Sequence, residues 1–409
     1  MVDMTCDLPP ILLDVSRLVS RLGAGPLTGI DRVEAEWLRH LSRTPHLLLC
    51  RVPRADLLLP PEAGPRILRW LGGEVSDLQS AGWIDRLRNR GGLPERAAQA
   101  LRDMALAQAT IPRLRDMAVE RLGAGCIYLN LGHANWRREV FGGLSPMKRV
   151  VMIHDTIPLD HPEFTRQGQS DKFRDRFMNV TAMSDLILTV SDDSRDHIAL
   201  WRGKLAVQKR APIAVVPIGT RIGASVPADL PAGLDLSRPY FVTLGTIEPR
   251  KNHGLLLDIW DRLREGGGAV PDLYIVGRRG WENRDVFARL DALPAGGPVR
   301  ELNGLSDGAV AALLDGARAL LMPSRAEGFG LPLTEAAARG LPVLTAPLPS
   351  AKALLGEGAS YIDPYDGAGW EAAIRTLNET PVQRLTPLPV PNWDDHFKNA
   401  ANTLRDLAL

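Results

Sequence analysis

The chain has 409 residues, a length that predicts two to three domains. Its 49 lysines and arginines nearly balance 48 aspartates and glutamates, and the resulting net charge of +1 argues against a nucleic-acid binder. Hydrophobic residues at 45% and charged residues at 24% are ordinary values for a globular protein. Cys6, Cys50 and Cys126 form neither a zinc-binding spacing nor a disulfide framework, which indicates a reducing compartment.

The N-terminal segment is predicted to be a strand rather than an export signal. Asp3 and Asp7 stand where a signal peptide carries positive charge, and Asp14 and Arg17 interrupt the apolar stretch. No run approaches the roughly 18 apolar residues that a membrane span needs. We therefore expect a cytoplasmic protein that can still sit on a membrane surface.

Twelve short apolar runs follow one another along the chain, and helical patterns separate most of them. Runs apolar on both faces are typical of parallel strands covered by helices, and their alternation with helices predicts an open α/β sheet. Six runs precede a Gly- and Pro-rich stretch and six follow it, so we expect this architecture twice. The predicted strands are Ile11–Val15, His46–Val52, Cys126–Leu131, Arg149–Ile153, Leu186–Val190, Ile213–Val216, Tyr240–Leu244, Leu273–Val276, Val299–Leu302, Ala319–Met322, Pro342–Leu344 and Ser360–Ile362.

The domain boundary is predicted within Pro217–Pro239, which lacks an apolar period. We expect one Rossmann-like domain over residues 1–220, a second over 221–390 and a C-terminal helix over 391–409. Ligands of doubly wound sheets bind beyond the carboxyl ends of the strands. Two such domains facing each other would form a cleft, and clefts of this kind are preferred binding sites.

Residues 56–122 depart from the alternation, because they are mostly helical in pattern and rich in arginine, including Arg86, Arg88 and Arg90. One interpretation is a solvated helical insertion, since acidic residues are interspersed. The other is a surface for an acidic acceptor or an anionic lipid.

The stretch from Pro323 to Ala336 combines a glycine-containing loop with a helix predicted to begin near Pro332. Backbone N–H groups from Gly328 to Leu331, beside the positive end of that helix, suit a phosphate or another anion. Glu327 in the loop and Glu335 in the helix are eight positions apart, which favours two different roles. One carboxylate can reach a sugar hydroxyl while the other reaches a ribose diol.

Two further motifs also follow predicted strands. Gly245 opens the loop GTIEPRKN, in which Arg250 and Lys251 are adjacent cations that suit a diphosphate, although a solvated turn is the simpler interpretation. His154 follows Arg149–Ile153 and is either a buried structural histidine or a donor to substrate. Motifs at three matching strand ends carry more weight than any one of them.

These residues resemble the large retaining glycosyltransferase family 4, which has the GT-B fold and includes bacterial polysaccharide and O-antigen mannosyltransferases. The resemblance is specific over roughly residues 240–365. It implies that Glu327 contacts the transferred sugar, that Glu335 holds the nucleotide ribose, and that His154 contacts the sugar from the N-terminal domain. It also implies that the cations and the loop bind the donor diphosphate, through Arg250, Lys251, Gly245, Gly328, Phe329, Gly330 and Leu331. The sequence departs from the family at Thr246, where an arginine is common, and at Ala353, where a glutamate is common.

The implied function is retaining transfer of a hexose from a nucleoside-diphosphate sugar to a glycan or lipid-linked acceptor in surface-polysaccharide biosynthesis. GDP-mannose is our choice of donor, because relatives with EPRKN often resemble O-antigen mannosyltransferases. We expect no metal ion and no cofactor, since the sequence contains no D-x-D. A lipid-linked acceptor would place the protein on the cytoplasmic face of the inner membrane.

Five other functions share some of these features. Ser306 lies in a G-x-S-x-G pattern, but only His396 follows it, so a hydrolase is disfavoured and Ser306 is better explained as a helix cap. The loop at Gly23 lacks a dinucleotide fingerprint, which disfavours a dehydrogenase. A non-catalytic scaffold subunit of a polysaccharide assembly complex remains as the alternative, and an epimerase or phosphorylase could share the architecture.

Overall fold

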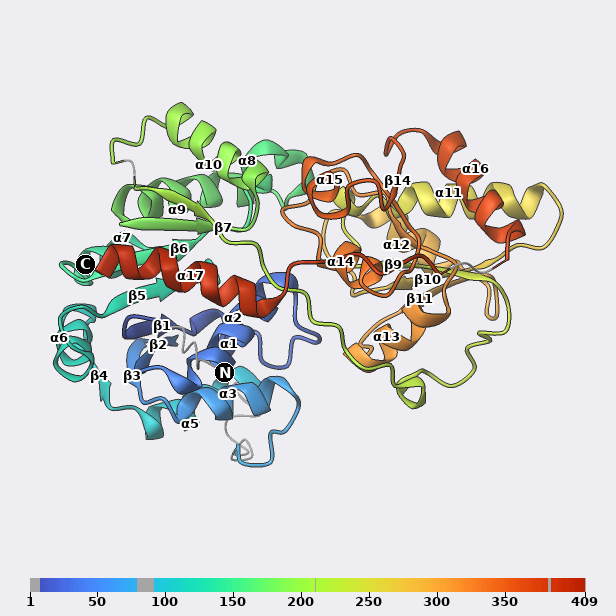
Figure 1. Ribbon diagram of the computed structural model, residues 1–409. Coiled ribbons are helices and arrows are strands. Elements are labelled where there is room, and N and C mark those ends of the chain that lie inside the picture. The colour runs from blue at the N-terminus through green and yellow to red at the C-terminus, as the bar shows by residue number, and fades with distance from the viewer. Residues whose placement is uncertain (1–7, 79–91, 210, 382–383, 409) are drawn as a thin grey trace. The chain divides into compact units, whose positions relative to one another are not determined.

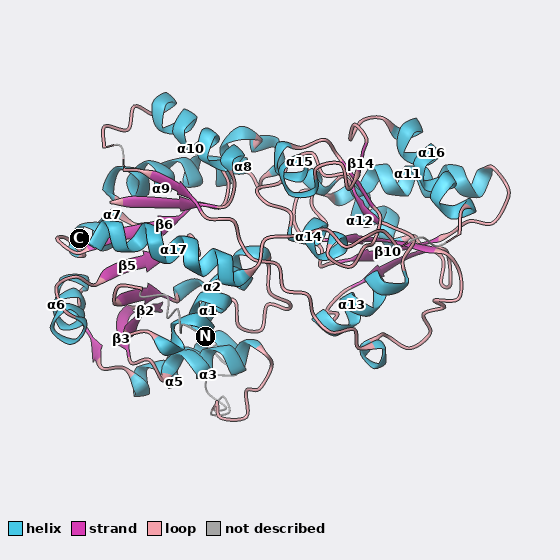
Figure 2. Cartoon of the chain, viewed as in Figure 1, coloured by secondary structure: helices cyan, strands magenta, loops and turns pink. Residues whose placement is uncertain are grey.

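The computed structural model describes residues 8–78, 92–209, 211–381 and 384–408, so Cys6, Arg86, Arg88 and Arg90 lie outside the described residues. The chain forms two compact units, each with its own sheet covered by helices (Figures 1 and 2). Unit 1 comprises Met1–Asp155, Phe173–Ile218 and Asp394–Leu409. Unit 2 comprises Thr156–Lys172 and Gly219–Trp393.

Unit 1 contains an eight-stranded sheet in the order β4-β3-β2-β1-β5-β6-β7-β8. The six strands predicted for this half are all present and parallel, with ends that differ by no more than one residue. The bounds are β1 Ile11–Asp14, β2 His46–Val52, β3 Ala55–Leu59, β4 Ala107–Gln108, β5 Ile127–Asn130, β6 Lys148–Met152, β7 Leu186–Thr189 and β8 Ile213–Val215.

The described part of the region 56–122 is mostly helical, as predicted, but it also supplies most of β3 and all of β4, which were not predicted. A two-residue turn at Pro53 and Arg54, with Arg54 at φ 67°, folds β3 back antiparallel to β2. The apolar side chains of Leu57–Leu59 are thereby buried. The helices of unit 1 are α1 Ser16–Ser20, α2 Gly29–His40, α3 Ala63–Leu71, α5 Leu93–Met104, α6 Ile111–Leu122, α7 Arg138–Gly143, α9 Gln169–Met183, α10 Asp192–Lys204 and α17 Trp393–Ala408, with the first residues of α9 and α17 assigned to unit 2.

The predicted C-terminal helix forms as α17 and packs on α2 of unit 1. The indole nitrogen of Trp37 donates to Nε2 of His396 at 2.9 Å, and the ring of Phe397 stacks on His40 with centroids 3.6 Å apart. His396 is therefore occupied in holding the last helix on unit 1.

Unit 2 contains a six-stranded, all-parallel sheet in the order β11-β10-β9-β12-β13-β14. All six strands predicted for this half are present. The strands are β9 Tyr240–Leu244, β10 Asp272–Val276, β11 Val299–Leu302, β12 Leu320–Met322, β13 Val343–Thr345 and β14 Ser360–Tyr361. The helices are α8 Ile157–Asp160, α11 His253–Glu265, α12 Arg284–Asp291, α13 Asp307–Gly316, α14 Leu331–Ala337, α15 Pro349–Leu355 and α16 Gly367–Glu379.

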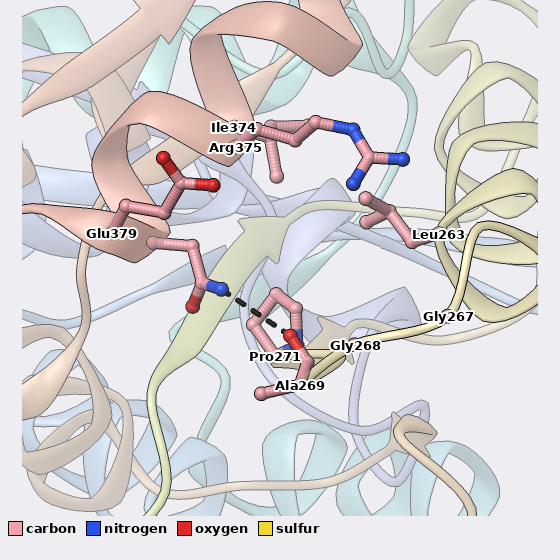
Figure 3. A pocket seen from close by; sticks show the side chains of 9 residues that line it. Leu263, Gly267, Gly268, Ala269, Pro271, Ile374, Arg375 and Glu379 are labelled. Atoms are coloured by element: carbon pink, nitrogen blue, oxygen red, sulfur yellow. Dashed lines mark hydrogen bonds between the residues drawn. The ribbon is translucent and has the colours of Figure 1, made fainter.

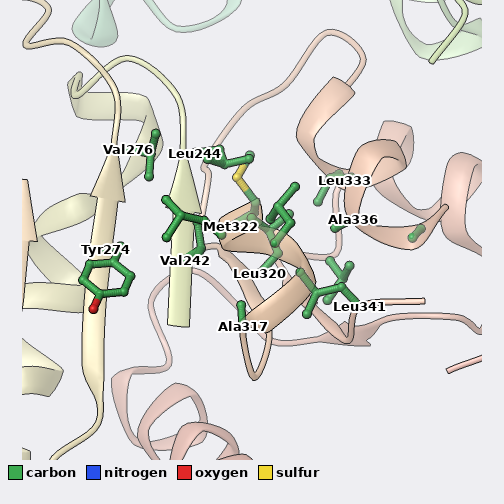
Figure 4. Packing of buried hydrophobic residues seen from close by; sticks show 14 of the residues in the cluster. Val242, Leu244, Tyr274, Val276, Ala317, Leu320, Met322, Leu333, Ala336 and Leu341 are labelled. Atoms are coloured by element: carbon green, nitrogen blue, oxygen red, sulfur yellow. The ribbon is translucent and has the colours of Figure 1, made fainter. Parts of the chain in front are cut away.

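Alternating side chains of the unit 2 strands enter two separate cores. Tyr240, Val242 and Leu244 of β9 pack with α13, α14 and α15, as Figure 4 shows in part. Phe241 packs on the other face with α11, α12 and α16. Strands buried on both faces explain why continuous apolar runs predicted them correctly.

Ser306 caps a helix, as the sequence favoured. Its hydroxyl accepts from the N–H of Ala309 at 3.1 Å and donates to Asp229 at 2.6 Å. The free thiols Cys50 and Cys126 are buried. Within the described residues, no helix combines the length and the apolar character needed to cross a bilayer.

Candidate active site

The order of the strands in unit 2 marks a ligand site. β9 lies between β10 and β12, so the direction in which the chain builds the sheet reverses between β9 and β12. Ligands of open α/β sheets bind beyond the carboxyl ends of the strands at such a reversal. The loops after β9, residues 245–252, and after β12, residues 323–330, leave the sheet there, and both carry predicted motifs.

Glycine shapes the loop after β9. Gly245 has φ 135°, and a Cβ on Gly277, directly after β10, would overlap the carbonyl oxygen of Gly245. The chain then forms a 3-10 turn over Pro249–Lys251, and Asn252 at φ 58° leads into α11. This turn fixes the backbone from which the two cations project.

Both predicted cations contact the predicted sugar-binding carboxylate. Nη1 of Arg250 donates to Oε2 of Glu327 at 2.8 Å, and Nζ of Lys251 donates to Oε1 of the same side chain. Arg250 also donates to the carbonyl of Ala326 at 2.9 Å. The N–H of Arg325 donates to the carbonyl of Arg250 at 2.7 Å, which joins the two loops through their backbones.

A fourth charged group, Glu248, belongs to this cluster and was not predicted. Its Oε1 lies 2.5 Å from Nε of Arg250, on the edge of the guanidinium that does not face Glu327. Its side chain is 2% exposed, and Oε2 is buried without a hydrogen-bond partner among the described residues. Two carboxylates and two cations therefore form one cluster, in which only Arg250 is partly exposed.

Burial and charge act in opposite directions on the pKa of Glu327. Burial raises the pKa of Glu327, but the positive charges of Arg250 and Lys251 lower it by more, so that the pKa is about 2. Burial lowers the pKa of Lys251 and raises the pKa of Glu248 in spite of the cations beside it. Glu327 is ionised at neutral pH, so it can accept hydrogen bonds or stabilise positive charge but cannot donate a proton.

The loop after β12 continues into α14 as predicted. Gly330, at φ 108°, precedes the helix, Pro332 stands in its first turn, and Phe329 is buried. Glu335 is half-buried on α14. That this loop binds a diphosphate and that Glu335 holds a ribose stay predictions.

A neighbouring loop borders the cluster. Asn252 donates to the carbonyl of Pro364 at 2.9 Å and accepts from Nη2 of Arg325 at 3.0 Å. The guanidinium of Arg325 lies 5.1 Å from the ring centroid of Tyr365, which is 73% exposed. The loop after β14 is thus tied to the same end of the sheet.

His154 lies in unit 1, after β6, and is buried. Its Nε2 lies 2.8 Å from the carbonyl of Leu131, and because a carbonyl only accepts, Nε2 carries the proton. Burial lowers the pKa of His154 to about 4, against the opposing effect of this hydrogen bond. The structure therefore shows a neutral, anchored histidine, and its contact with a sugar stays a prediction.

Unit 1 holds a second polar cluster that the sequence reasoning missed. The carboxylate of Asp14, the last residue of β1, accepts from the N–H of Ser16, the hydroxyl of Tyr128 and the amide of Asn135, at 2.8–2.9 Å. β1 lies between β2 and β5, so this cluster also stands at a reversal of strand order. An acidic residue closing an apolar run was the available signal.

The pocket drawn in Figure 3 is a different place. Its lining comes from the ends of α11 and α16 and from the glycine-rich stretch after α11, whereas the predicted cations precede α11. Asn378 donates to the carbonyl of Ala269 across it at 3.4 Å. None of the predicted site residues lines it. Among the residues that the structure describes, no three His, Cys, Asp or Glu side chains are grouped to hold a metal ion.

Comparison with known proteins finds a family match over part of the chain. Residues 231–386 match the family described as Glycosyl transferases group 1. The serotype-specific mannosyltransferase WbdA of Escherichia coli is 30% identical over 223 residues, which are 51% of this chain and 27% of the relative. O-antigen chain mannosyltransferase B of Escherichia coli is 27% identical over 232 residues, 54% of this chain and 58% of the relative.

The matched region spans between 26% and 33% of the length of the three WbdA relatives. Among solved structures, sucrose-phosphate synthase from Thermosynechococcus elongatus has a TM-score of 0.61 at 16% identity, and the match covers 98% of this chain and 96% of that one. At this identity the similarity shows the fold, which is the two-domain GT-B fold that the sequence predicted.

Proposed function

Because residues 231–386 form a Glycosyl transferases group 1 domain, we propose that the protein is a retaining glycosyltransferase. It transfers a hexose from a nucleoside-diphosphate sugar to a glycan or lipid-linked acceptor in surface-polysaccharide biosynthesis. One observation carries this proposal. Arg250 and Lys251 converge on Glu327 at the reversal of strand order in unit 2, where α/β sheets bind ligands.

In the proposed reaction the bond from the anomeric carbon to the β-phosphate oxygen breaks, and its electron pair stays on the diphosphate. The acceptor oxygen forms the new bond on the same face, and its proton passes to a diphosphate oxygen. Positive charge develops at the anomeric carbon while negative charge develops on the leaving group. Fixed cations such as Arg250 and Lys251 act on the latter, and each group of this kind contributes about 3–4 kcal/mol.

The ionisation of Glu327 limits its role in this scheme. A carboxylate with a pKa of about 2 accepts hydrogen bonds from sugar hydroxyls and stabilises nearby positive charge. It does not serve as a general acid at neutral pH. We assign to Glu335 the ribose of the nucleotide, and to the loop Gly328–Leu331 the diphosphate. His154, neutral in unit 1, is assigned to a sugar hydroxyl.

GDP-mannose is the proposed donor, and the similarity to Escherichia coli mannosyltransferases supports a mannosyl group. No metal ion is required in this scheme, since Arg250 and Lys251 supply the positive charge at the leaving group. A lipid-linked acceptor would bring the protein to a membrane surface as a peripheral protein.

The test is calorimetry of GDP and UDP binding in EDTA, with wild type beside the double variant Arg250→Ala/Lys251→Ala. We expect wild type to bind GDP without metal and the double variant to lose that binding. Preferential binding of UDP would change the proposed donor to a UDP-sugar and leave the proposed function unchanged. Binding of neither nucleotide would refute the transferase and favour the non-catalytic scaffold. If the protein binds a nucleotide, product analysis with GDP-mannose is the next experiment.

A further inference from the structure

Arg250 is held from two edges by two carboxylates. Its Nε lies 2.5 Å from Oε1 of Glu248, while its Nη1 lies 2.8 Å from Oε2 of Glu327. Arginine presents its donors in a rigid planar fork, so fixing Nε also fixes the direction of the Nη groups. Glu248, the partner of Nε, therefore determines the direction in which Nη1 points.

The two carboxylates are anchored differently. Glu248 belongs to the same tight turn as Arg250, because the N–H of Lys251 donates to the carbonyl of Glu248 at 3.1 Å. Gly280 packs against this turn, and a Cβ there would lie 3.4 Å from Cβ of Glu248 and 2.7 Å from a methyl group of Thr246. Glu248 thus has a fixed backbone and an almost completely buried side chain.

Glu327 reaches the same guanidinium from the loop after β12, 77 positions further along the chain. Gly328 follows Glu327 directly in the chain. The side chain of Glu327 is 8% exposed, against 2% for Glu248. A phosphate oxygen can replace a carboxylate oxygen on an arginine edge, because both accept the same charge-assisted hydrogen bonds. Glu327 is the partner that an incoming anion can replace, and Glu248 is the partner that stays.

We propose that Glu248 is a positioning residue for Arg250, which it holds by Nε so that Nη1 can pass from Glu327 to the diphosphate of the donor. This inference rests on the proposed function. In this arrangement Glu327 is hydrogen-bonded to Arg250 and Lys251 before the donor binds. When the diphosphate replaces it on these cations, Glu327 is free to contact the sugar. Arg250 then supplies the guanidinium that relatives commonly carry at the position of Thr246, and Glu248 orients it.

Two substitutions separate positioning from charge. Glu248→Gln keeps an oxygen that can accept from Nε and removes the negative charge. Glu248→Asp keeps the charge and withdraws it by one methylene group from Arg250. Asp272→Asn is the matched control, because Asp272 is likewise a buried carboxylate of unit 2 beside an arginine, with Oδ1 3.5 Å from Nη2 of Arg238. It stands at the start of β10, at the opposite end of the sheet.

The readout is the calorimetric Kd of GDP or UDP, whichever wild type binds, together with the melting temperature of each variant. We expect Glu248→Asp to weaken binding at least tenfold, Glu248→Gln to tighten it, and Asp272→Asn to leave it unchanged. In an Arg250→Ala background, Glu248→Asp should cause no further loss. These opposite responses cannot arise from a general loss of stability.

Equal Kd values for wild type and Glu248→Asp would overturn the inference, and so would parallel weakening by Asp and Gln that follows the melting temperature. In both cases the proposed function survives, since wild type still binds the nucleotide. Wild type that binds neither nucleotide would refute the proposed function and this inference together.

Discussion

Replacement of Glu327 by glutamine tests the central ion cluster through stability as well as binding. The difference between the ordinary pKa of 4.5 and the folded pKa of about 2 corresponds to about 3 kcal/mol of stability at neutral pH. A carboxylate whose pKa falls on folding contributes this stability above pH 4.5, and the contribution is lost as the pH falls toward 2. By linkage, about 1 kcal/mol of it remains at pH 3.

The free energies of unfolding of wild type and Glu327→Gln should therefore differ by about 3 kcal/mol at pH 7, and the difference should shrink by about 2 kcal/mol at pH 3. Urea denaturation followed by tryptophan fluorescence at pH 7, 5 and 3 measures both values. Glu265→Gln, at the exposed end of α11, is the control and should change little. A difference that stays constant from pH 7 to pH 3 would refute the low pKa.

The same variant separates the roles of the cluster in the proposed reaction. Arg250 and Lys251 remain in Glu327→Gln, so binding of nucleoside diphosphate should persist. Transfer of the sugar should slow by about 100-fold, since a group fixed toward the developing charge is gone. Loss of nucleotide binding would show that Glu327 shapes the donor site itself.

Three further changes follow from the geometry. Gly277→Ala should destabilise the protein by about 3 kcal/mol in thermal melts, because its Cβ would overlap the carbonyl oxygen of Gly245. Lys251→Met should cost about 3 kcal/mol, since it breaks a buried pair and leaves Glu327 with Arg250 as its remaining cation. Wild type should lose about 3 kcal/mol of stability as the pH falls from 6.5 to 4, because the unfolded histidine binds a proton that the buried one does not, and His154→Gln should abolish that loss.

Each of these three predictions has a result that would contradict it. Gly223→Ala is the control for the glycine, because the nearest atom to its Cβ would be the carbonyl oxygen of Asp307 at 4.0 Å, and equal losses would rule out the overlap as the cause. Lys251→Met that is as stable as wild type would mean that the pair with Glu327 does not stabilise the fold. Wild type and His154→Gln with the same dependence on pH would show that the histidine is not held neutral.

The sequence predicted the sheets well because the relevant signal is local. A parallel strand covered on both faces is a short apolar run, and Tyr240–Leu244 and Val299–Leu302 match β9 and β11 to the residue. β3 was missed because its apolar run is short and lies beside an arginine-rich region. The run Ala55–Leu59 has only three consecutive leucines after Asp56, and it was assigned to an arginine-rich helical region although the short turn before it is a hairpin signal.

The site was predicted at the level of loops and not of side-chain pairs. The motifs placed Arg250, Lys251 and Glu327 at neighbouring strand ends, which the sheet order confirms. The sequence assigned the cations to a diphosphate and the carboxylate to a sugar, so it did not anticipate that they would pair with one another. That pairing depends on side-chain orientation across 77 positions of sequence. Glu248 lay inside the quoted motif, but its contact with Nε is equally invisible in a linear pattern.

The cluster bears on the choice between an enzyme and a scaffold. Two buried carboxylates paired with a buried lysine and a partly exposed arginine are a poor means of stabilising a fold, because replacing buried ion pairs with well-packed apolar groups is often neutral or favourable. The apolar cores around Val242 and Phe241 already hold the sheet of unit 2 together, and the cluster stands outside them at the strand ends. Charges that are dehydrated and oriented before a ligand arrives are what electrostatic catalysis requires. A scaffold gains nothing from that arrangement, so the geometry favours a protein that binds and turns over an anionic donor.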